Sequence, residues 1–148
     1  MIVSCSGDIF ESKAQALVNP VNCVGVMGKG LALEFRKRYV DNYIAYQNAC
    51  KEQRVQIGEV LVTKTTTEDG AKYIINFPTK IHWKDRSHLE YINLGLLGMR
   101  NTLMALKIKS VAIPRLGCGL GGLNWQIVRS VVIQVLQDLD DVEIQLYD

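Results

Sequence analysis

One stretch decides the fold of this chain: Val18-Asn-Pro-Val-Asn22-Cys-Val-Gly-Val-Met-Gly28-Lys-Gly30-Leu-Ala32. It leads from an apolar strand expected over residues 16–18, which Asn19-Pro20 should end, into a helix expected over 31–39. Glycine lets a ligand approach the backbone, and the first turn of a helix offers free N–H donors with partial positive charge. The loop between them is therefore a candidate phosphate cradle.

A second loop of the same kind is Gly117-Cys-Gly-Leu-Gly-Gly122, between a strand expected over 110–114 and a helix that Asn124 can cap. Either loop alone would fit a tight turn, but two at matching strand-to-helix junctions favour a diphosphate site. The glycines match a dinucleotide-binding pattern by letter, yet only one helix and one strand follow them, which excludes a Rossmann half. Gly30 replaces the Ser or Thr of a P-loop after Lys29, which argues against a kinase or ATPase.

Strands and helices alternate along the whole sequence. Further strands are expected over 1–6, 59–64, 72–77 and 142–147, and further helices over 41–51, from Ser87 to near Lys107, and over 124–136. Ser87 and Glu90 have the spacing of a capping box at the start of the third helix. With no linker or repeat, the pattern predicts one α/β domain over 1–148, a three-layer α/β/α arrangement around a central mixed sheet.

Composition excludes several classes of protein. The net charge of +2 is too small to indicate nucleic-acid binding by itself, and no apolar run or basic leader suggests a membrane span or a secretory signal. The four cysteines are scattered, with no Cys-x-x-Cys pair and no nearby histidine, so neither a metal site nor a disulfide framework is expected. We expect a cytoplasmic protein with free thiols and no cofactor.

These residues resemble the macrodomain family, whose members bind ADP-ribose. The similarity covers essentially the whole chain and rests on three landmarks in the family's order: Gly7-Asp-Ile9, Ala16-Leu-Val-Asn-Pro-Val-Asn22 and the loop at 117–122. Within the family, the first glycine loop and the stretch Ile74-Ile-Asn-Phe-Pro-Thr-Lys80-Ile-His-Trp83 are most similar to DNA ADP-ribosyl glycohydrolase antitoxins of the DarG type and to the terminal ADP-ribose glycohydrolase. The resemblance implies the macrodomain fold.

The resemblance also implies a set of ADP-ribose contacts. Asp8 would accept a hydrogen bond from the adenine amino group beside the backbone N–H of Ile9, and Asn22 would hold the distal ribose. Without the family, Asp8 would be a turn cap, and Asn22 a turn former beside Pro20. The remaining expected contacts are Gly28, Lys29, Gly30, Leu31, Thr79, Gly117, Cys118, Gly119, Leu120, Gly121 and Gly122.

Lys80 is the expected catalytic residue, because it follows an apolar strand at the motif where the resembling glycohydrolases have their essential lysine. A neutral amine would attack C1 of the open distal ribose, whereas a cation would stabilise charge as the glycosidic bond breaks. The first route needs a lowered lysine pKa. The sequence does not choose between them, and without the motif a loop lysine would be solvated surface.

The resemblance implies removal of ADP-ribose from thymidine in single-stranded DNA, which reverses a partner transferase toxin. His82, Trp83 and Lys84 are candidate DNA contacts, by base stacking and phosphate binding. Gly121 stands where the terminal ADP-ribose glycohydrolase has an aspartate, which counts against its protein-glutamate substrate. A non-catalytic ADP-ribose reader and a hydrolase of O-acetyl-ADP-ribose stay open. Antitoxins of this type also have a C-terminal region that contacts the toxin.

Overall fold

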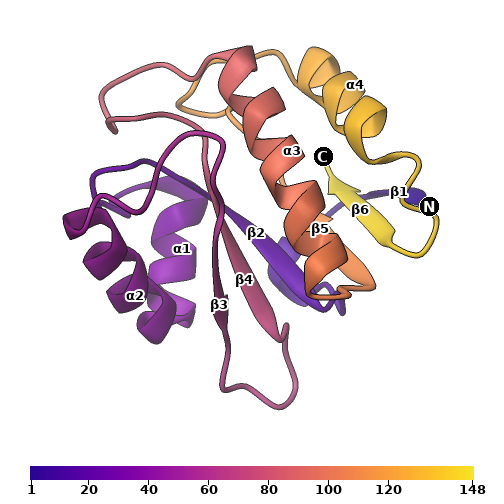
Figure 1. Cartoon of the computed structure of the whole chain (residues 1–148), viewed down its shortest axis with the longest axis horizontal. Helices are drawn as coiled ribbons and strands as arrows, with labels where there is room; N and C mark the ends of the chain where they lie inside the picture. Colours follow the sequence, from indigo (N-terminus) through magenta and orange to yellow (C-terminus); the bar gives the residue numbers. More distant parts are fainter.

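A computed structural model describes residues Met1–Asp148 and contains six strands and four α-helices (Figure 1). The strands are β1 (Ile2–Cys5), β2 (Ala16–Val21), β3 (Leu61–Lys64), β4 (Tyr73–Pro78), β5 (Ser110–Ile113) and β6 (Glu143–Tyr147). The helices are α1 (Gly30–Arg38), α2 (Val40–Lys51), α3 (Leu89–Ala105) and α4 (Trp125–Leu136), with a short 3₁₀ turn η1 (Ile9–Glu11). All the expected strands and α-helices are present; the 3₁₀ turn was not expected.

The strands form one sheet in the order β1-β6-β5-β2-β4-β3. Every neighbouring pair is parallel except β3 and β4, which are antiparallel. Helices α1 and α2 cover one face, and α3 and α4 cover the other (Figure 1). The predicted three-layer arrangement with a mixed sheet is thereby confirmed.

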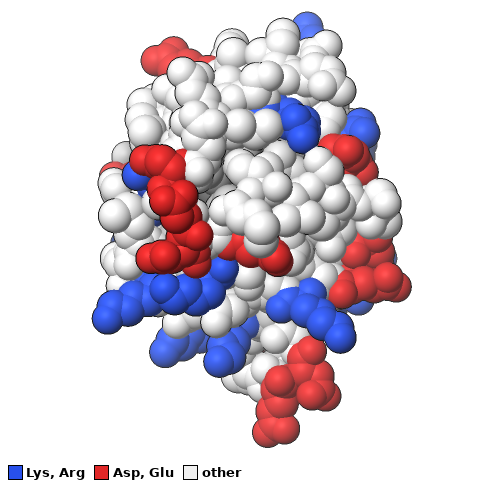
Figure 2. Space-filling view, turned by 90° about the vertical axis from the view of Figure 1, so that its right-hand side faces the viewer, with Lys and Arg blue, Asp and Glu red and all other residues white.

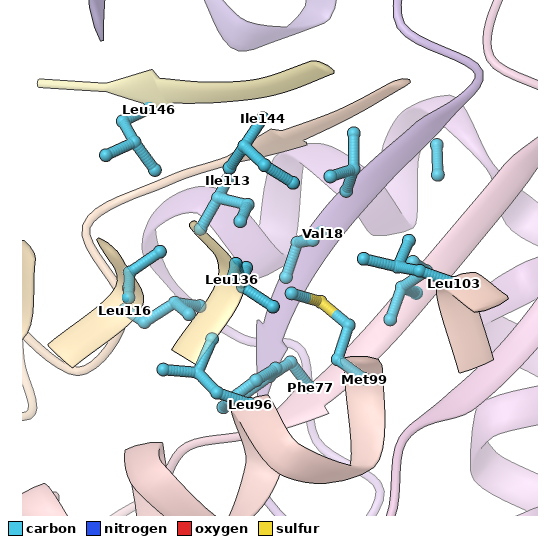
Figure 3. Packing of buried hydrophobic residues seen from close by; sticks show 14 of the residues in the cluster. Val18, Phe77, Leu96, Met99, Leu103, Ile113, Leu116, Leu136, Ile144 and Leu146 are labelled. Atoms are coloured by element: carbon cyan, nitrogen blue, oxygen red, sulfur yellow. The ribbon is translucent and has the colours of Figure 1, made fainter. Parts of the chain in front are cut away.

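Alternate residues of the central strands supply the two cores, because successive side chains of a strand point to opposite faces. Leu17 and Ile74 pack with Phe35 of α1 on one face. Val18 and Ile75 belong to the larger cluster on the other face. There, strand residues point toward Leu96, Met99 and Leu103 of α3 and Leu136 of α4 (Figure 3).

Strand β2 continues further than the sequence predicts. Asn19 and Pro20 do not end it but pair with Asn76 and Phe77 of β4. Strand β5 pairs with β2 only at Ala16 and Leu17. Pro20 therefore lies beyond the part of β2 that has neighbours on both sides, where a missing N–H is tolerated.

The start of α3 also differs from the prediction. His88 is its N-cap residue and makes no side-chain capping bond, so the expected capping box of Ser87 and Glu90 is absent. Ser87 is instead buried, with a hydroxyl that has no hydrogen-bond partner. By contrast, Asn124 caps α4 as expected, because its side chain accepts a hydrogen bond of 3.3 Å from the amide of Ile127.

Three buried asparagines connect α2 to the sheet. The side-chain amides of Asn42 and Asn76 bond reciprocally, at 3.0 and 2.8 Å. The amide of Asn19 donates to Asn76 Oδ1 at 3.1 Å, and Thr63 donates to Asn42 Oδ1 at 2.7 Å. Because buried amides are costly unless paired, this network fixes the register of α2 on the sheet.

The surface adds two general observations. The face seen in Figure 2 carries both acidic and basic side chains, so it presents no field of one sign. None of the helices combines the length and the apolarity that a membrane span requires.

Candidate functional site

A cleft of about 630 Å³ opens at the carboxyl ends of β2, β4 and β5. Parallel α/β sheets place ligand sites at this edge, and the volume is in the range of small-molecule pockets. Both glycine loops line it, as the sequence predicts. The lining residues are Pro20, Val21, Asn22, Val26, Gly28, Lys29, Gly30, Leu31, Ala32, Thr79, Lys80, Trp83, Pro114, Arg115, Gly117, Cys118, Gly119, Leu120 and Gly121.

The first loop is organised by the side chain of Asn22. Its Oδ1 accepts hydrogen bonds from the amides of Val24 and Val26, at 3.0 and 3.4 Å, and its Nδ2 donates to the carbonyl of Val26 at 2.8 Å. The buried hydroxyl of Tyr46 donates to the same Oδ1 at 2.8 Å. Burial raises the pKa of Tyr46, so this hydroxyl keeps its proton. Asn22 is thus a loop former in this structure.

This loop leads directly into an open helix N-terminus. Lys29 is the N-cap residue of α1 and makes no side-chain capping bond. The first backbone bond of the helix is donated by Leu33 to Lys29, so the amides of Gly30, Leu31 and Ala32 have no partner within the protein. All three residues line the cleft. Their N–H groups suit an anion such as a phosphate.

The second loop contributes further free amides to the same cleft. Backbone bonds from Gly122 to Gly119, 3.1 Å, and from Leu123 to Gly117, 2.9 Å, fold it into consecutive turns. The amides of Gly119, Leu120 and Gly121 donate to no protein acceptor. A run of unpaired N–H groups of this kind is an anion-binding nest. The cleft therefore has phosphate-binding donors from two loops, as a diphosphate needs.

Lys80 lies on the same cleft, directly after β4. It is partly buried, and its Nζ donates a hydrogen bond of 3.0 Å to the main-chain carbonyl of Trp83. Trp83 is 48% exposed, and the centre of its ring lies 5.2 Å from Lys84 Nζ and 5.2 Å from the centre of the His82 ring. His82 and Lys84 do not line the cleft themselves but flank it beside Trp83.

Exposed apolar side chains border the cleft near Lys80. Leu120 is 70% exposed, which is unusual for leucine, and Val26 and Trp83 line the cleft with it. Val24 and Ile81 are also exposed, and a backbone bond of 2.8 Å from Cys23 to Ile81 holds their two loops together. Apolar surface next to cationic side chains is typical of sites that bind unstacked bases.

Five predicted site residues lie outside the lining. Asp8 is exposed and is the N-cap residue of η1, because its carboxylate accepts a 2.9 Å hydrogen bond from the amide of Phe10. Ile9 is buried in the core beneath this turn. Gly122 lies next to the cleft at the end of the second loop, and the other two are His82 and Lys84. Their contacts with a ligand stay predictions.

Six lining residues were not predicted: Pro20, Val21, Val26, Ala32, Pro114 and Arg115. Each of them lies within three positions of a predicted residue, so proximity to the loops was the available signal. Arg115 is exposed at the cleft, and its guanidinium lies 5.9 Å from the centre of the Trp125 ring.

The cysteines near the cleft are not activated nucleophiles. Burial, followed by the nearby Cys50, raises the pKa of Cys23 to about 11. Burial also raises the pKa of Cys118, and this effect outweighs the nearby charge of Arg115, which lowers the pKa. Because the thiolate is the reactive form, both thiols are poorly suited to nucleophilic attack.

Comparison with known proteins identifies the family. The macro domain model matches residues 18–132. A curated protein of Mycobacterium tuberculosis named DNA ADP-ribosyl glycohydrolase is 48% identical over 147 residues, which are 99% of this chain and 42% of that protein. The chain therefore spans less than half the length of this relative.

Two solved structures share the fold. The macrodomain of Mycobacterium tuberculosis DarG matches with a TM-score of 0.97 at 48% identity, over 99% of this chain and 97% of that chain. A Thermosipho africanus structure described as DarTG in complex with ADP-ribose matches with a TM-score of 0.86 at 39% identity, over 95% of this chain and 39% of that one.

Proposed function

This chain belongs to the macrodomain family, and we propose that it is a glycohydrolase that binds ADP-ribose and removes it from modified DNA. The single observation that carries the proposal is the position of Lys80 on a cleft that has free backbone amides from two loops. The names of relatives at 43% and 48% identity, DNA ADP-ribosyl glycohydrolase, support the DNA substrate.

In this proposal the diphosphate lies between the two loops. The free amides of residues 30–32 and 119–121 bind its oxygens, and charge-assisted hydrogen bonds of about 1.5–3 kcal/mol each make micromolar affinity attainable. Asn22 holds the distal ribose with the second hydrogen of its amide, and Asp8 and Ile9 receive the adenine. The distal ribose then lies toward Lys80.

Lys80 acts on the bond between C1 of the distal ribose and the thymine nitrogen. As a neutral amine it adds to C1 of the ring-opened sugar, the thymine leaves C1 together with a proton, and a Schiff base between C1 and the lysine forms. Water then hydrolyses this Schiff base to ADP-ribose and the free amine. As a cation it stabilises charge while water adds to C1 and the base leaves. Borohydride added during turnover separates the two roles: a reduced adduct on Lys80 indicates the amine, and efficient turnover without an adduct indicates the cation.

Two features favour DNA over a protein glutamate as the carrier of the ADP-ribose. Trp83 and Leu120 offer exposed apolar surface next to the cleft, with Lys84 over the Trp83 ring, which suits an unstacked base and a neighbouring phosphate. In addition, Gly121 supplies no carboxylate to pair with Lys80. The proposed partner is thus ADP-ribosylated single-stranded DNA.

The decisive experiment incubates the protein and its Lys80→Ala variant with an oligonucleotide that carries one ADP-ribosylated thymidine. Release of unmodified oligonucleotide by the parent protein, lost by at least 100-fold in Lys80→Ala, is expected. Unchanged substrate together with intact binding of free ADP-ribose would make the protein a reader. Parallel assays with O-acetyl-ADP-ribose and an ADP-ribosylated glutamate peptide identify the substrate if the DNA is not cleaved.

The wider role follows from the proposed reaction. A Thermosipho africanus relative, 38% identical, is named a fusion of a DNA ADP-ribosyl transferase and a DNA ADP-ribosyl glycohydrolase. This supports a cognate transferase toxin as the partner whose DNA modification is reversed. Four free cysteines agree with the reducing cytoplasm as the place of action.

A further inference from the structure

The segment that carries Lys80 is tied at its start to the first glycine loop. The amide of Thr79 donates to the carbonyl of Val21 at 2.9 Å, and the amide of Cys23 donates to the carbonyl of Ile81 at 2.8 Å. The two residues that flank Lys80 are therefore fixed by backbone bonds. What remains to be fixed is the far end of the segment, beyond Trp83.

Ser87 holds that far end against the second glycine loop. Its amide donates a 3.0 Å hydrogen bond to the carbonyl of Gly121, and its side chain is 5% exposed. A Cβ placed on Gly121 would overlap Ser87 Oγ and lie 2.9 Å from Ser87 Cβ, and a Cβ on Gly117 would lie 3.1 Å from Ser87 Cβ. The Ser87 side chain thus fills a notch that exists because both residues are glycines.

The absence of a side chain at 121 has a steric cause. Gly117 and Gly122 have φ angles of +73° and +80°, which favour glycine in any case, but Gly121 is not in this region. A Cβ on Gly121 would meet both Ser87 and, at 2.5 Å, the carbonyl oxygen of Gly117. The Ser87 hydroxyl, moreover, has no hydrogen-bond partner and does not cap α3. The contact of Ser87 with the second glycine loop is therefore made by its Cβ and its backbone amide, and its hydroxyl makes no hydrogen bond there.

We infer that Ser87 is a positioning residue that clamps the Lys80 segment onto the second glycine loop. The inference rests on the proposed function of Lys80 and extends it. The clamp sets the placement of Lys80 relative to the diphosphate-binding amides of residues 119–121. Ser87 and the carbonyl oxygen of Gly117 together exclude a side chain at 121, so no carboxylate from that position can assist Lys80.

The clamp makes a distinctive prediction for three variants. Ser87→Ala keeps the Cβ and the amide, so the clamp persists. Ser87→Gly keeps the amide bond but empties the notch, and Gly121→Ala fills the notch from the other side, so both loosen the far end of the Lys80 segment. A displacement of about 1 Å can lower a rate by about 100-fold without preventing binding.

The experiment measures three quantities for each variant: hydrogen exchange of residues 79–88, affinity for free ADP-ribose, and single-turnover cleavage of the ADP-ribosylated oligonucleotide. For Ser87→Gly we expect faster exchange and cleavage reduced by about 10- to 100-fold, with ADP-ribose affinity changed by less than about 3-fold. Gly121→Ala should show the same faster exchange, but its Cβ also meets the carbonyl oxygen of Gly117 in the ligand-binding loop, so only its exchange is used to judge the clamp. Ser87→Ala should behave like the parent protein, and melting curves confirm folding.

Two results would overturn the clamp: exchange in Ser87→Gly that equals that of the parent protein, or a loss in Ser87→Ala as large as in Ser87→Gly. If Gly121→Ala does not fold, the pair of Ser87 variants still decides. Exchange does not depend on turnover. A parent protein that cleaves no substrate therefore refutes the proposed function, while the exchange data still decide the clamp.

Discussion

The amine of Lys80 donates a 3.0 Å hydrogen bond to the main-chain carbonyl of Trp83, so these two residues form one unit at the edge of the cleft. Because the acceptor is a backbone atom, the side chain at position 83 can change without removing this bond. The indole, 48% exposed, is thus not needed to hold Lys80 and is available to a substrate.

Trp83→Ala should weaken binding of an ADP-ribosylated oligonucleotide much more than binding of free ADP-ribose. Stacking of a base on an aromatic ring contributes about 1–3 kcal/mol, so the expected loss for the oligonucleotide is about 5- to 150-fold. Titration of both ligands against the Lys80→Ala background avoids turnover. Trp83→Phe is the control that keeps an aromatic face, and equal losses for the two ligands would contradict a role in base stacking.

Gly119→Ala tests the second loop as a phosphate-binding nest. A Cβ at this position meets no protein atom within 4 Å, and the residue lines the cleft, so the added methyl should obstruct the ligand without disturbing the fold. Loss of one charge-assisted hydrogen bond costs about 1.5–3 kcal/mol, so the affinity for ADP-ribose should fall by about 10- to 100-fold. Calorimetric titration and a melting curve measure the two effects; a lower melting temperature with unchanged affinity would refute the assignment.

The glycine loops were predictable from the sequence because their chemistry is local. Strand, glycine-rich loop and helix follow one another within about fifteen residues, so a helix N-terminus next to a flexible loop can be recognised without knowing the rest of the fold. The alternation of strands and helices likewise indicated the layers. Both loops then met at one sheet edge because parallel strands end there.

What the sequence did not reveal depends on distant contacts. Ser87 and Glu90 have the spacing of a capping box, but Ser87 packs against Gly121, 34 positions later, and this tertiary contact replaces the local one. Similarly, Asn19-Pro20 looks like a strand end, yet pairing with Asn76 and Phe77 of β4 extends the strand. The sequence located each loop at its strand-to-helix junction but did not reveal the partner on which it packs.

Asn42→Ala should destabilise the fold by about 2 kcal/mol or more. The substitution removes Asn42 from the buried network: the amide nitrogen of Asn76 keeps only its bond to the Leu61 carbonyl, and the half-buried hydroxyl of Thr63 loses its acceptor. Loss of buried hydrogen bonds and the unsatisfied groups that it leaves cost about 1–3 kcal/mol each. Asn48→Ala is the matched control, because Asn48 is exposed on the same helix. Urea unfolding measures both, and a similar midpoint for the two variants would show that the asparagine network contributes little.

Stability should decrease in alkaline solution, in part through Cys23. Burial raises the pKa of this thiol from 9.0 to about 11 in the folded protein, so the unfolded chain loses the proton first as the pH rises. The contribution of Cys23 to the free energy of unfolding is therefore complete below about pH 9 and is lost as the pH approaches 11. Cys23→Ala should accordingly reduce the slope of stability against pH across this window.

Urea unfolding at intervals from pH 7 to pH 11 provides the measurement, with Cys5→Ala as the control for loss of a thiol from β1. If the slope for Cys23→Ala equals that of the parent protein, the alkaline loss arises elsewhere, and Tyr46, whose pKa burial also raises, becomes the residue to examine.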